Sequence, residues 1–279
     1  MKFMSHTQNN KSVLAAVNSF FNRASLFCTE HVILCLSGLL LLSLILKLAE
    51  HFLDPALGRD ASYYCLMAQA WYENGVIDNS SWTPPLLTFL MKCGAEAGLS
   101  VQTTGSALSI IAGVLCTLAG YKIALEVTDS KKIALISAAF CAVHPGINTI
   151  SIQIGRDAIY LCLAGFTIWT ALAGLKRKSW LFWCLSGVFC ALSATARFET
   201  FEFFPLAACL LLVAAISKKL LWKQALLYGF CFYIFTAVSF YGAINCMAPQ
   251  MFSRYKSYFN GQFNKAKQQY SNPQKGEQK

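Results

Sequence analysis

The sequence predicts an all-α fold: a polytopic bundle of about seven transmembrane helices, with amphipathic surface helices in the first outer loop. Of its 279 residues, 56% are hydrophobic and only 13% are charged. A soluble domain usually carries about a quarter charged residues, so much of this surface must face something other than water. Apolar runs of about 17 to 25 residues, the length that crosses a bilayer, recur along the chain.

The expected elements follow from these runs. A polar segment, 1–30, is read as an uncleaved cytoplasmic N-terminus because it lacks the short leader and cleavage site of a secretory signal. A membrane module is expected over 31–247, followed by a polar, basic tail over 248–279. The predicted spans of this module are 31–49, 104–125, 131–144, 157–175, 180–196, 201–216 and 224–247.

The charges orient these spans. Basic clusters beginning at Lys131, Lys176 and Lys218 separate successive pairs of spans, and the positive-inside rule places all three in the cytoplasm together with the N-terminus. Most acidic residues then fall outside. The net charge of +10 is therefore a matter of topology, and we expect no nucleic acid partner. The basic tail is the exception: with seven spans it lies outside, whereas an even number would bring it inside.

The 12 cysteines do not form a disulfide or zinc framework. Most lie singly inside apolar runs, where cysteine behaves as a small hydrophobic residue. No Cys-x-x-Cys pair occurs, and no Cys and His residues have zinc-ligand spacing. Cys65 and Cys93 share the first outer loop, so a bridge between them stays open.

The first outer loop, 50–103, is the longest region between spans. Asp60 stands where a helix would begin, and we expect its side chain to cap the first turn. Tyr64, Met67 and Trp71 then fall on one face, which predicts an amphipathic helix along the membrane surface. Asn74-Gly75 is expected to end this helix. Pro84-Pro85 begins a second apolar helix over 86–99.

Four groups of polar residues project to the outer face. They are Arg59-Asp60, His144-Pro145, Arg156-Asp157 with Tyr160, and Arg197-Phe198-Glu199. Charges at membrane depth are costly, so their gathering needs a reason. One interpretation is that the arginines and acids pair with one another and hold span ends together. The other is a site for an anionic substrate, in which guanidinium groups bind a phosphate. His144 alone is more typical of a structural residue at a helix break than of a ligand.

The order of these motifs resembles that of the GT-C glycosyltransferases, which include the protein O-mannosyltransferases and the enzymes that add aminoarabinose to lipid A. Arg59-Asp60-x-x-x-Tyr64 followed by Pro84-Pro85-Leu86 is similar to their first outer loop. His144-Pro145 leading to Arg156-Asp157-x-x-Tyr160, and Thr195-Ala196-Arg197-Phe198-Glu199 with Pro205 downstream, are similar to two later motifs. The resemblance covers about residues 30 to 245, nearly the whole shared seven-span module.

The resemblance implies an inverting enzyme of a bacterial inner membrane that moves a sugar from a polyprenyl-phosphate carrier to an acceptor hydroxyl on the outer face. Asp60 would be the general base and would also touch a divalent cation, Mg or Mn. The implied substrate-binding residues are Arg59, Tyr64, His144, Arg156, Asp157, Tyr160, Arg197 and Glu199. The acceptor would be a lipid, glycan or protein, and membrane lipids surround the module.

Two departures from the family pattern keep an alternative open. Many members carry a second acid after the first, whereas Asp60 is followed by Ala61. Typical members also continue with further spans, whereas this chain stops soon after the shared module. A compact enzyme, an enzyme completed by a partner subunit, and an inactive scaffold or lipid-binding subunit all fit this pattern.

Overall fold

The computed structural model describes residues 27, 29–53, 60–75 and 84–249, and all regular elements in these ranges are helical. In chain order they are α2 (Val32–Leu53), α3 (Ala61–Asn74), α4 (Leu86–Glu96), α5 (Val101–Thr128), α6 (Lys131–Val143), α7 (Pro145–Ile152), α8 (Arg156–Arg177), α9 (Trp180–Ala194), the 3-10 helix η1 (Phe198–Glu202), α10 (Phe203–Ile216) and α11 (Trp222–Met247). The predicted all-α bundle is confirmed, and most helix ends lie within a few residues of the predicted ones. The second surface helix is shorter than expected, because it ends at Glu96.

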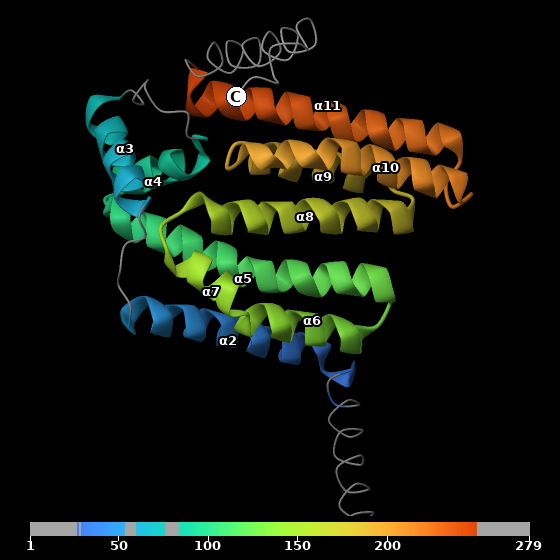
Figure 1. The fold of residues 1–279 in the computed structure, drawn as a ribbon, viewed down its shortest axis with the longest axis horizontal. Coiled ribbons are helices and arrows are strands. Elements are labelled where there is room, and N and C mark those ends of the chain that lie inside the picture. Colours follow the sequence, from blue (N-terminus) through green and yellow to red (C-terminus); the bar gives the residue numbers. More distant parts are fainter. Residues whose placement is uncertain (1–26, 28, 54–59, 76–83, 250–279) are drawn as a thin grey trace, which may run out of the picture.

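The long helices lie side by side in one bundle (Figure 1). Helix α11 packs on α9, α9 on α8, α8 on α5, and α5 on α6, while α2 lies against α5 and α6. Helices α3 and α4 pack on each other and on α5, and they cover one end of the bundle.

The hydropathy of these helices makes the chain an integral membrane protein. Five helical segments of the described chain are long and apolar enough to cross a bilayer, or six if the bent pair α6 and α7 forms one span. Helix α9 has 15 residues, which is fewer than the roughly 20 that a span needs. It lies between α8 and α11, with Trp183 and Cys190 buried. The count of seven spans stays a prediction.

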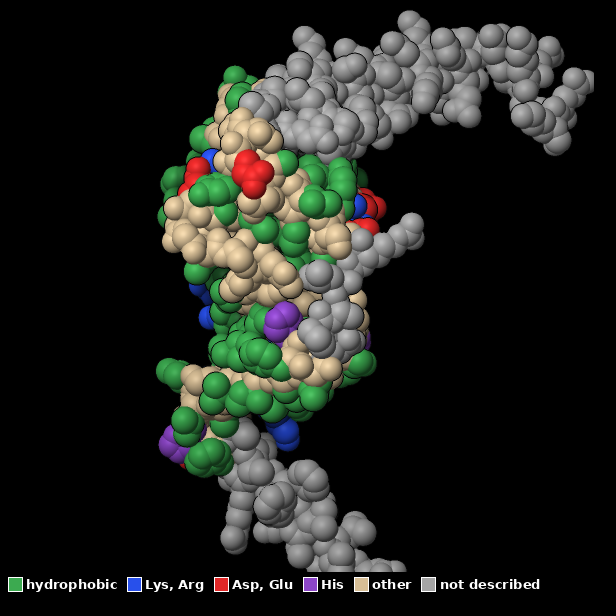
Figure 2. Space-filling view, turned by 90° about the vertical axis from the view of Figure 1, so that its left-hand side faces the viewer, with side chains coloured by type: hydrophobic (Ala, Val, Ile, Leu, Met, Phe, Trp, Pro, Cys, Tyr) green, Lys and Arg blue, Asp and Glu red, His purple; other side chains and the backbone are tan. Residues whose placement is uncertain are grey.

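The two ends of the bundle differ in their charges. The basic clusters at the start of α6, the end of α8 and the end of α10 lie together at the end away from α3 and α4 (Figure 1). At this basic end, the largely buried carboxylate of Glu126 on α5 accepts a 2.6 Å hydrogen bond from Arg177 on α8. Lys176 pairs with Asp129. Figure 2 looks onto the opposite end, where acidic side chains interrupt a surface of apolar and uncharged groups.

We expect the basic end to face the cytoplasm, because cytoplasmic loops carry an excess of Lys and Arg. A cysteine introduced at Lys219 should react with a membrane-impermeant maleimide only after permeabilisation, whereas one at Glu73 should react in intact cells. The unsubstituted chain measures the background from its own cysteines. Reversed labelling would invert the topology. Tags on the two termini extend the test, since equal accessibility of both would mean an even number of spans.

Glycine permits the close approach of α9 and α11. A Cβ atom at Gly187 would lie 2.6 Å from the carbonyl oxygen of Phe232 and 3.0 Å from the amide nitrogen of Thr236. Both atoms belong to the backbone of α11, so neither can swing away.

We therefore expect Gly187→Ala to destabilise the protein by about 1 to 3 kcal/mol, the usual cost of overpacking. Thermal unfolding in detergent measures this change. Gly242→Ala on α11 is the matched control, because no heavy atom lies within 4 Å of its added Cβ. It should leave the melting temperature unchanged or slightly raised, since alanine is the better helix former. Equal effects at both positions would contradict the argument.

The amphipathic character of α3 is confirmed. Tyr64, Met67 and Trp71 are buried, whereas Ser62 and Glu73 are exposed. The buried face packs against protein, namely α4 and α5, rather than directly against lipid. Gly75 ends the helix as predicted: its φ of 69° is left-handed, and its N–H donates to the carbonyl of Trp71.

The bridge between Cys65 and Cys93 does not form. Both residues carry free thiols, and burial raises the pKa of the Cys65 thiol above its ordinary value.

Candidate active site

A cavity of ≈ 390 Å³ opens at the end of the bundle that carries α3 and α4. Three segments that are far apart in the sequence form it: the start of α3, the link from α7 into α8, and the turn that follows α9. The lining residues are Asp60, Tyr64, Ile150, Gln153, Ile154, Gly155, Arg156, Asp157 and Arg197.

Arg156 is the first residue of α8 and lines the cavity. The preceding Gly155 has an extended backbone and no side chain that could cap the helix. Within the described chain Arg156 forms neither a hydrogen bond nor an ion pair, although it lines the cavity. The uncapped N–H groups of a helix N-terminus also favour negative charge. This wall of the cavity is therefore suited to an anion.

Arg197, by contrast, is held by two carboxylates. Its guanidinium donates to Asp157 on α8 and, at 2.5 Å, to Glu199 on η1. These hydrogen bonds, that of Glu199 first, raise the pKa of Arg197 above its ordinary value, although burial opposes them. The interpretation of mutual pairing is thus correct for Arg197, Asp157 and Glu199, but it does not extend to Arg156.

The turn that carries Arg197 is fixed by hydrogen bonds. Thr200 donates through its hydroxyl to the Arg197 carbonyl at 2.8 Å, and the hydroxyls of Thr200 and Ser193 lie 3.0 Å apart. The amide of Leu86, which begins α4, donates to the carbonyl of Thr195. The last of these contacts connects the turn after α9 to the start of α4.

Asp60 lines the cavity, and the expectation that its side chain caps α3 is wrong. The residue stands at the N-cap position, but its φ and ψ of −87° and −13° are helical and its carboxylate makes no capping hydrogen bond. A capping side chain needs an extended backbone, which turns its oxygen back towards the amides of the first turn. The exposed carboxylate of Asp60 therefore remains available at the cavity. Ala61 is fully buried, so a second acid at this position would face the apolar core.

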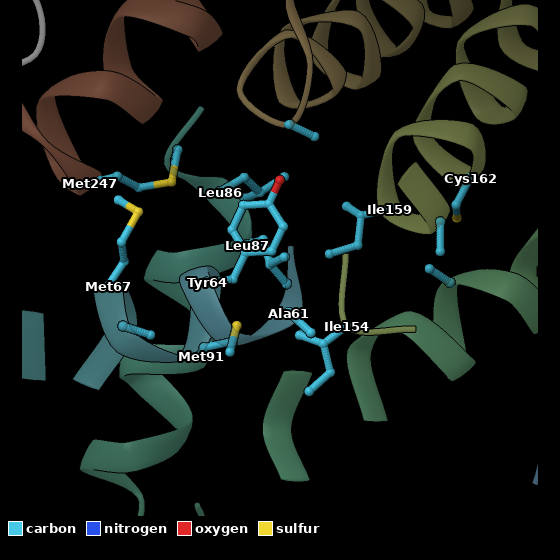
Figure 3. Packing of buried hydrophobic residues seen from close by; sticks show 14 of the residues in the cluster. Ala61, Tyr64, Met67, Leu86, Leu87, Met91, Ile154, Ile159, Cys162 and Met247 are labelled. Carbon is cyan, nitrogen blue, oxygen red and sulfur yellow. The ribbon is translucent and has the colours of Figure 1, made fainter. Parts of the chain in front are cut away.

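Tyr64 lies one turn beyond Asp60; it lines the cavity and also belongs to the buried apolar cluster (Figure 3). Leu87 of α4, Ile154 of the link and Ile159 of α8 belong to the same cluster. Burial raises the pKa of the Tyr64 phenol, and nearby Arg156 opposes this shift only partly. The phenol is therefore neutral at physiological pH and able to donate a hydrogen bond.

The remaining predicted residues lie beside the cavity or outside the described residues. The Arg197 guanidinium stacks over the Tyr160 ring at 5.5 Å, and Glu199 binds the same guanidinium from the exposed side. The His144 ring nitrogen Nδ1 accepts from the amide of Ile147 and caps α7, at a break where α6 and α7 are bent by 51°. His144 does not line the cavity. Arg59 lies outside the described residues.

The comparison with known families decides the class of this site. A family model described as dolichyl-phosphate-mannose-protein mannosyltransferase matches residues 83–241, which is more than half of the chain. The chain belongs to this family. No curated protein matches it.

Family membership confirms the GT-C resemblance and sets the coarse function: the chain is a membrane glycosyltransferase that uses a polyprenyl-phosphate sugar donor. The matched range contains both cavity arginines and His144. It begins downstream of Asp60, so the assignment of a role to Asp60 depends on its place at the cavity.

The cavity of this glycosyltransferase contains residues that motif reading missed, namely Ile150, Gln153, Ile154 and Gly155. Of these, Gln153 belongs to a polar stretch between the predicted spans 131–144 and 157–175. Because an apolar lining residue has no chemical signature of its own, only the fold reveals that Ile150 on α7 and Ile154 on the link line the cavity.

The described residues do not complete a metal site. No group of three His, Cys, Asp or Glu side chains among them is arranged to hold an ion. Two carboxylates line the cavity, and Arg197 already binds one of them, Asp157. The expected cation at Asp60 therefore stays a prediction.

Proposed function

We propose that this glycosyltransferase transfers its sugar at the cavity, on the outer face of a bacterial inner membrane, with inversion at the anomeric carbon. The observation that carries the proposal is that two groups of opposite charge line the same cavity, and neither has a hydrogen bond or ion pair through its side chain in the described residues. Asp60 supplies a carboxylate without a capping role, and Arg156 supplies a guanidinium without a hydrogen bond or ion pair in the described residues.

In this mechanism Asp60 takes the proton from the acceptor hydroxyl as the acceptor oxygen attacks the anomeric carbon. The bond between that carbon and the phosphate oxygen breaks, and the lipid phosphate leaves with the electron pair. Because the attack comes from the side opposite the leaving phosphate, the configuration inverts. No general acid is needed if the charge on the phosphate is met by fixed positive groups.

Arg156 is the group that we assign to this charge, since a planar guanidinium binds two phosphate oxygens at once. The uncapped start of α8 adds its N–H groups on the same wall. Arg197 lines the cavity too, but two carboxylates largely neutralise it. We propose that Arg197 mainly fixes the position of Asp157 and of the turn that follows α9. Its direct contribution to donor binding is then weaker than that of Arg156. To the neutral phenol of Tyr64, which lines the cavity, we assign a hydrogen bond to the sugar or the phosphate.

The test is an assay of the purified protein in lipid nanodiscs with polyprenyl-phosphate sugars, scored by release of the lipid phosphate. Lipid, glycan and peptide acceptors are supplied in turn, with Mg²⁺, Mn²⁺ or a chelator. We expect release with at least one donor and acceptor pair, and a product of inverted configuration. Donor binding without release for every pair would instead favour the lipid-binding scaffold. If a chelator does not change the release of lipid phosphate, the predicted metal at Asp60 is wrong.

A further inference from the structure

A lysine is buried inside the membrane module, away from the cavity. Lys47 on α2 has a relative exposure of 0%. Its ammonium donates to the Ser43 hydroxyl and to the Asn148 side-chain oxygen on α7, both at 2.8 Å. Thr117 on α5 donates to Ser43 at 3.2 Å and completes a small polar cluster between the three helices.

The packing of these helices is built around the lysine. A Cβ atom at Gly113 on α5 would lie 2.5 Å from the Lys47 Cε atom and 2.1 Å from the Ser151 hydroxyl on α7. The glycine therefore makes room for both side chains at once. Ser43 and Lys47 are also the buried residues of α2, whose other side chains are partly or fully exposed.

A buried ammonium needs an explanation, because a charge inside a membrane protein is costly and marks a functional position by default. Among the described residues Lys47 donates to two neutral acceptors and forms no ion pair, although the carboxylate of Glu50 attracts its charge at longer range. Apolar residues of similar size in place of Lys47 and its polar partners would avoid this cost. Stability alone therefore does not require a lysine here.

The helix that Lys47 holds leads directly into the cavity. Helix α7 has only eight residues and is bent away from α6, so its own length does little to fix it. Asn148, the partner of Lys47, lies on the same helix as Ile150, which lines the cavity. The chain then continues without a further helix through Gln153 to Arg156, whose guanidinium has no hydrogen bond or ion pair in the described residues.

We propose that Lys47 is a positioning residue for sugar transfer: through Asn148 it fixes α7, and α7 fixes the link that presents Arg156 to the donor. This inference rests on the proposed function of the cavity. Lys47 touches no substrate, and its effect is on the arrangement of residues 153–156.

The central experiment compares Lys47→Met, Asn148→Ala and the double variant with the wild-type protein. Hydrogen–deuterium exchange of residues 150–157 reports the order of the link without any need for turnover. Donor dissociation constants and melting temperatures are measured in parallel. If the competent arrangement falls to about a tenth of the population, the donor dissociation constant rises about tenfold.

We expect exchange in residues 150–157 to rise and donor affinity to fall by about this factor in both single variants. The double variant should be no worse than either single one, because both remove the same contact. Asn148→Asp, which keeps an acceptor for Lys47, should restore the protection and the affinity. Lys122→Met on α5 is the matched control: this ammonium lies over the Trp169 ring at 5.4 Å, away from α7, so its removal should leave both unchanged.

Wild-type exchange and wild-type donor affinity in Lys47→Met would overturn the proposal, as would a uniform rise in exchange over the whole bundle. If Lys47→Met does not fold, Asn148→Ala and its rescue by Asn148→Asp decide the question. If the wild-type protein itself binds no polyprenyl-phosphate donor, the proposed function fails. The exchange data then still show whether Lys47 orders the link.

Discussion

Replacing Asp60 with asparagine is expected to lower the turnover of sugar transfer by about 10²- to 10⁴-fold, the usual contribution of a general base. The fold should be unaffected. The Asp60 side chain makes no capping hydrogen bond and is exposed, so the isosteric amide removes only the ability to accept a proton. The measurement is release of lipid phosphate at saturating donor, together with the melting temperature.

Glu73→Gln is the matched control for this prediction. Glu73 is an exposed carboxylate on the same helix, it lies away from the cavity, and it accepts a 2.6 Å hydrogen bond from Gln69. Its amide variant should transfer sugar at the wild-type rate. Wild-type turnover in Asp60→Asn would show that another group takes the proton, and the assignment of Asp60 would fail.

The second large effect is expected at Arg156. Arg156→Lys should weaken donor binding about tenfold, because an ammonium cannot reproduce the two parallel hydrogen bonds of a guanidinium to a phosphate. Arg156→Ala should weaken it further. Neither variant should lower the melting temperature, since Arg156 has no hydrogen-bond or ion-pair partner in the described chain and its replacement therefore removes no stabilising contact there.

Arg197→Lys should behave differently, with a lower melting temperature as well as weaker donor binding. A single ammonium cannot bridge Asp157 and Glu199 in the way that the guanidinium does. Arg177→Lys at the basic end provides the control, because it weakens a contact to Glu126 that is far from the cavity. It should change stability but not donor affinity. Unchanged donor affinity in both Arg156→Lys and Arg197→Lys would contradict the proposal that this cavity binds the donor phosphate.

Local patterns in the sequence were sufficient to predict the helices and the end of the bundle at which the site lies. The burial of Tyr64, Met67 and Trp71 on one face of α3 follows from their spacing, because the helical period is a property of the backbone. The grouping of Asp60, Arg156 and Arg197 at one end follows from counting spans between basic clusters. Hydropathy and charge are properties of each segment by itself. The helices and the end of the bundle that carries the polar groups could therefore be predicted without knowledge of the fold.

The roles of individual side chains within the site depended on contacts between distant segments. Arg197 reaches Asp157 across 40 residues of chain, a pairing that the sequence left open, whereas Arg156 has no hydrogen bond or ion pair in the described residues. The capping role expected of Asp60 failed because the backbone enters α3 in a helical conformation, which the residue type alone does not specify.

Lys47 is the clearest case of a role decided by the tertiary structure. In the sequence it is one lysine near the end of an apolar run, typical of a side chain that reaches for the interface. In the fold its ammonium meets Asn148, 101 residues away. The sequence by itself determined which segments form helices and which end of the bundle carries the polar groups. The tertiary structure decided the partners of those groups, because partners depend on how each helix is rotated about its axis and which neighbours it packs against.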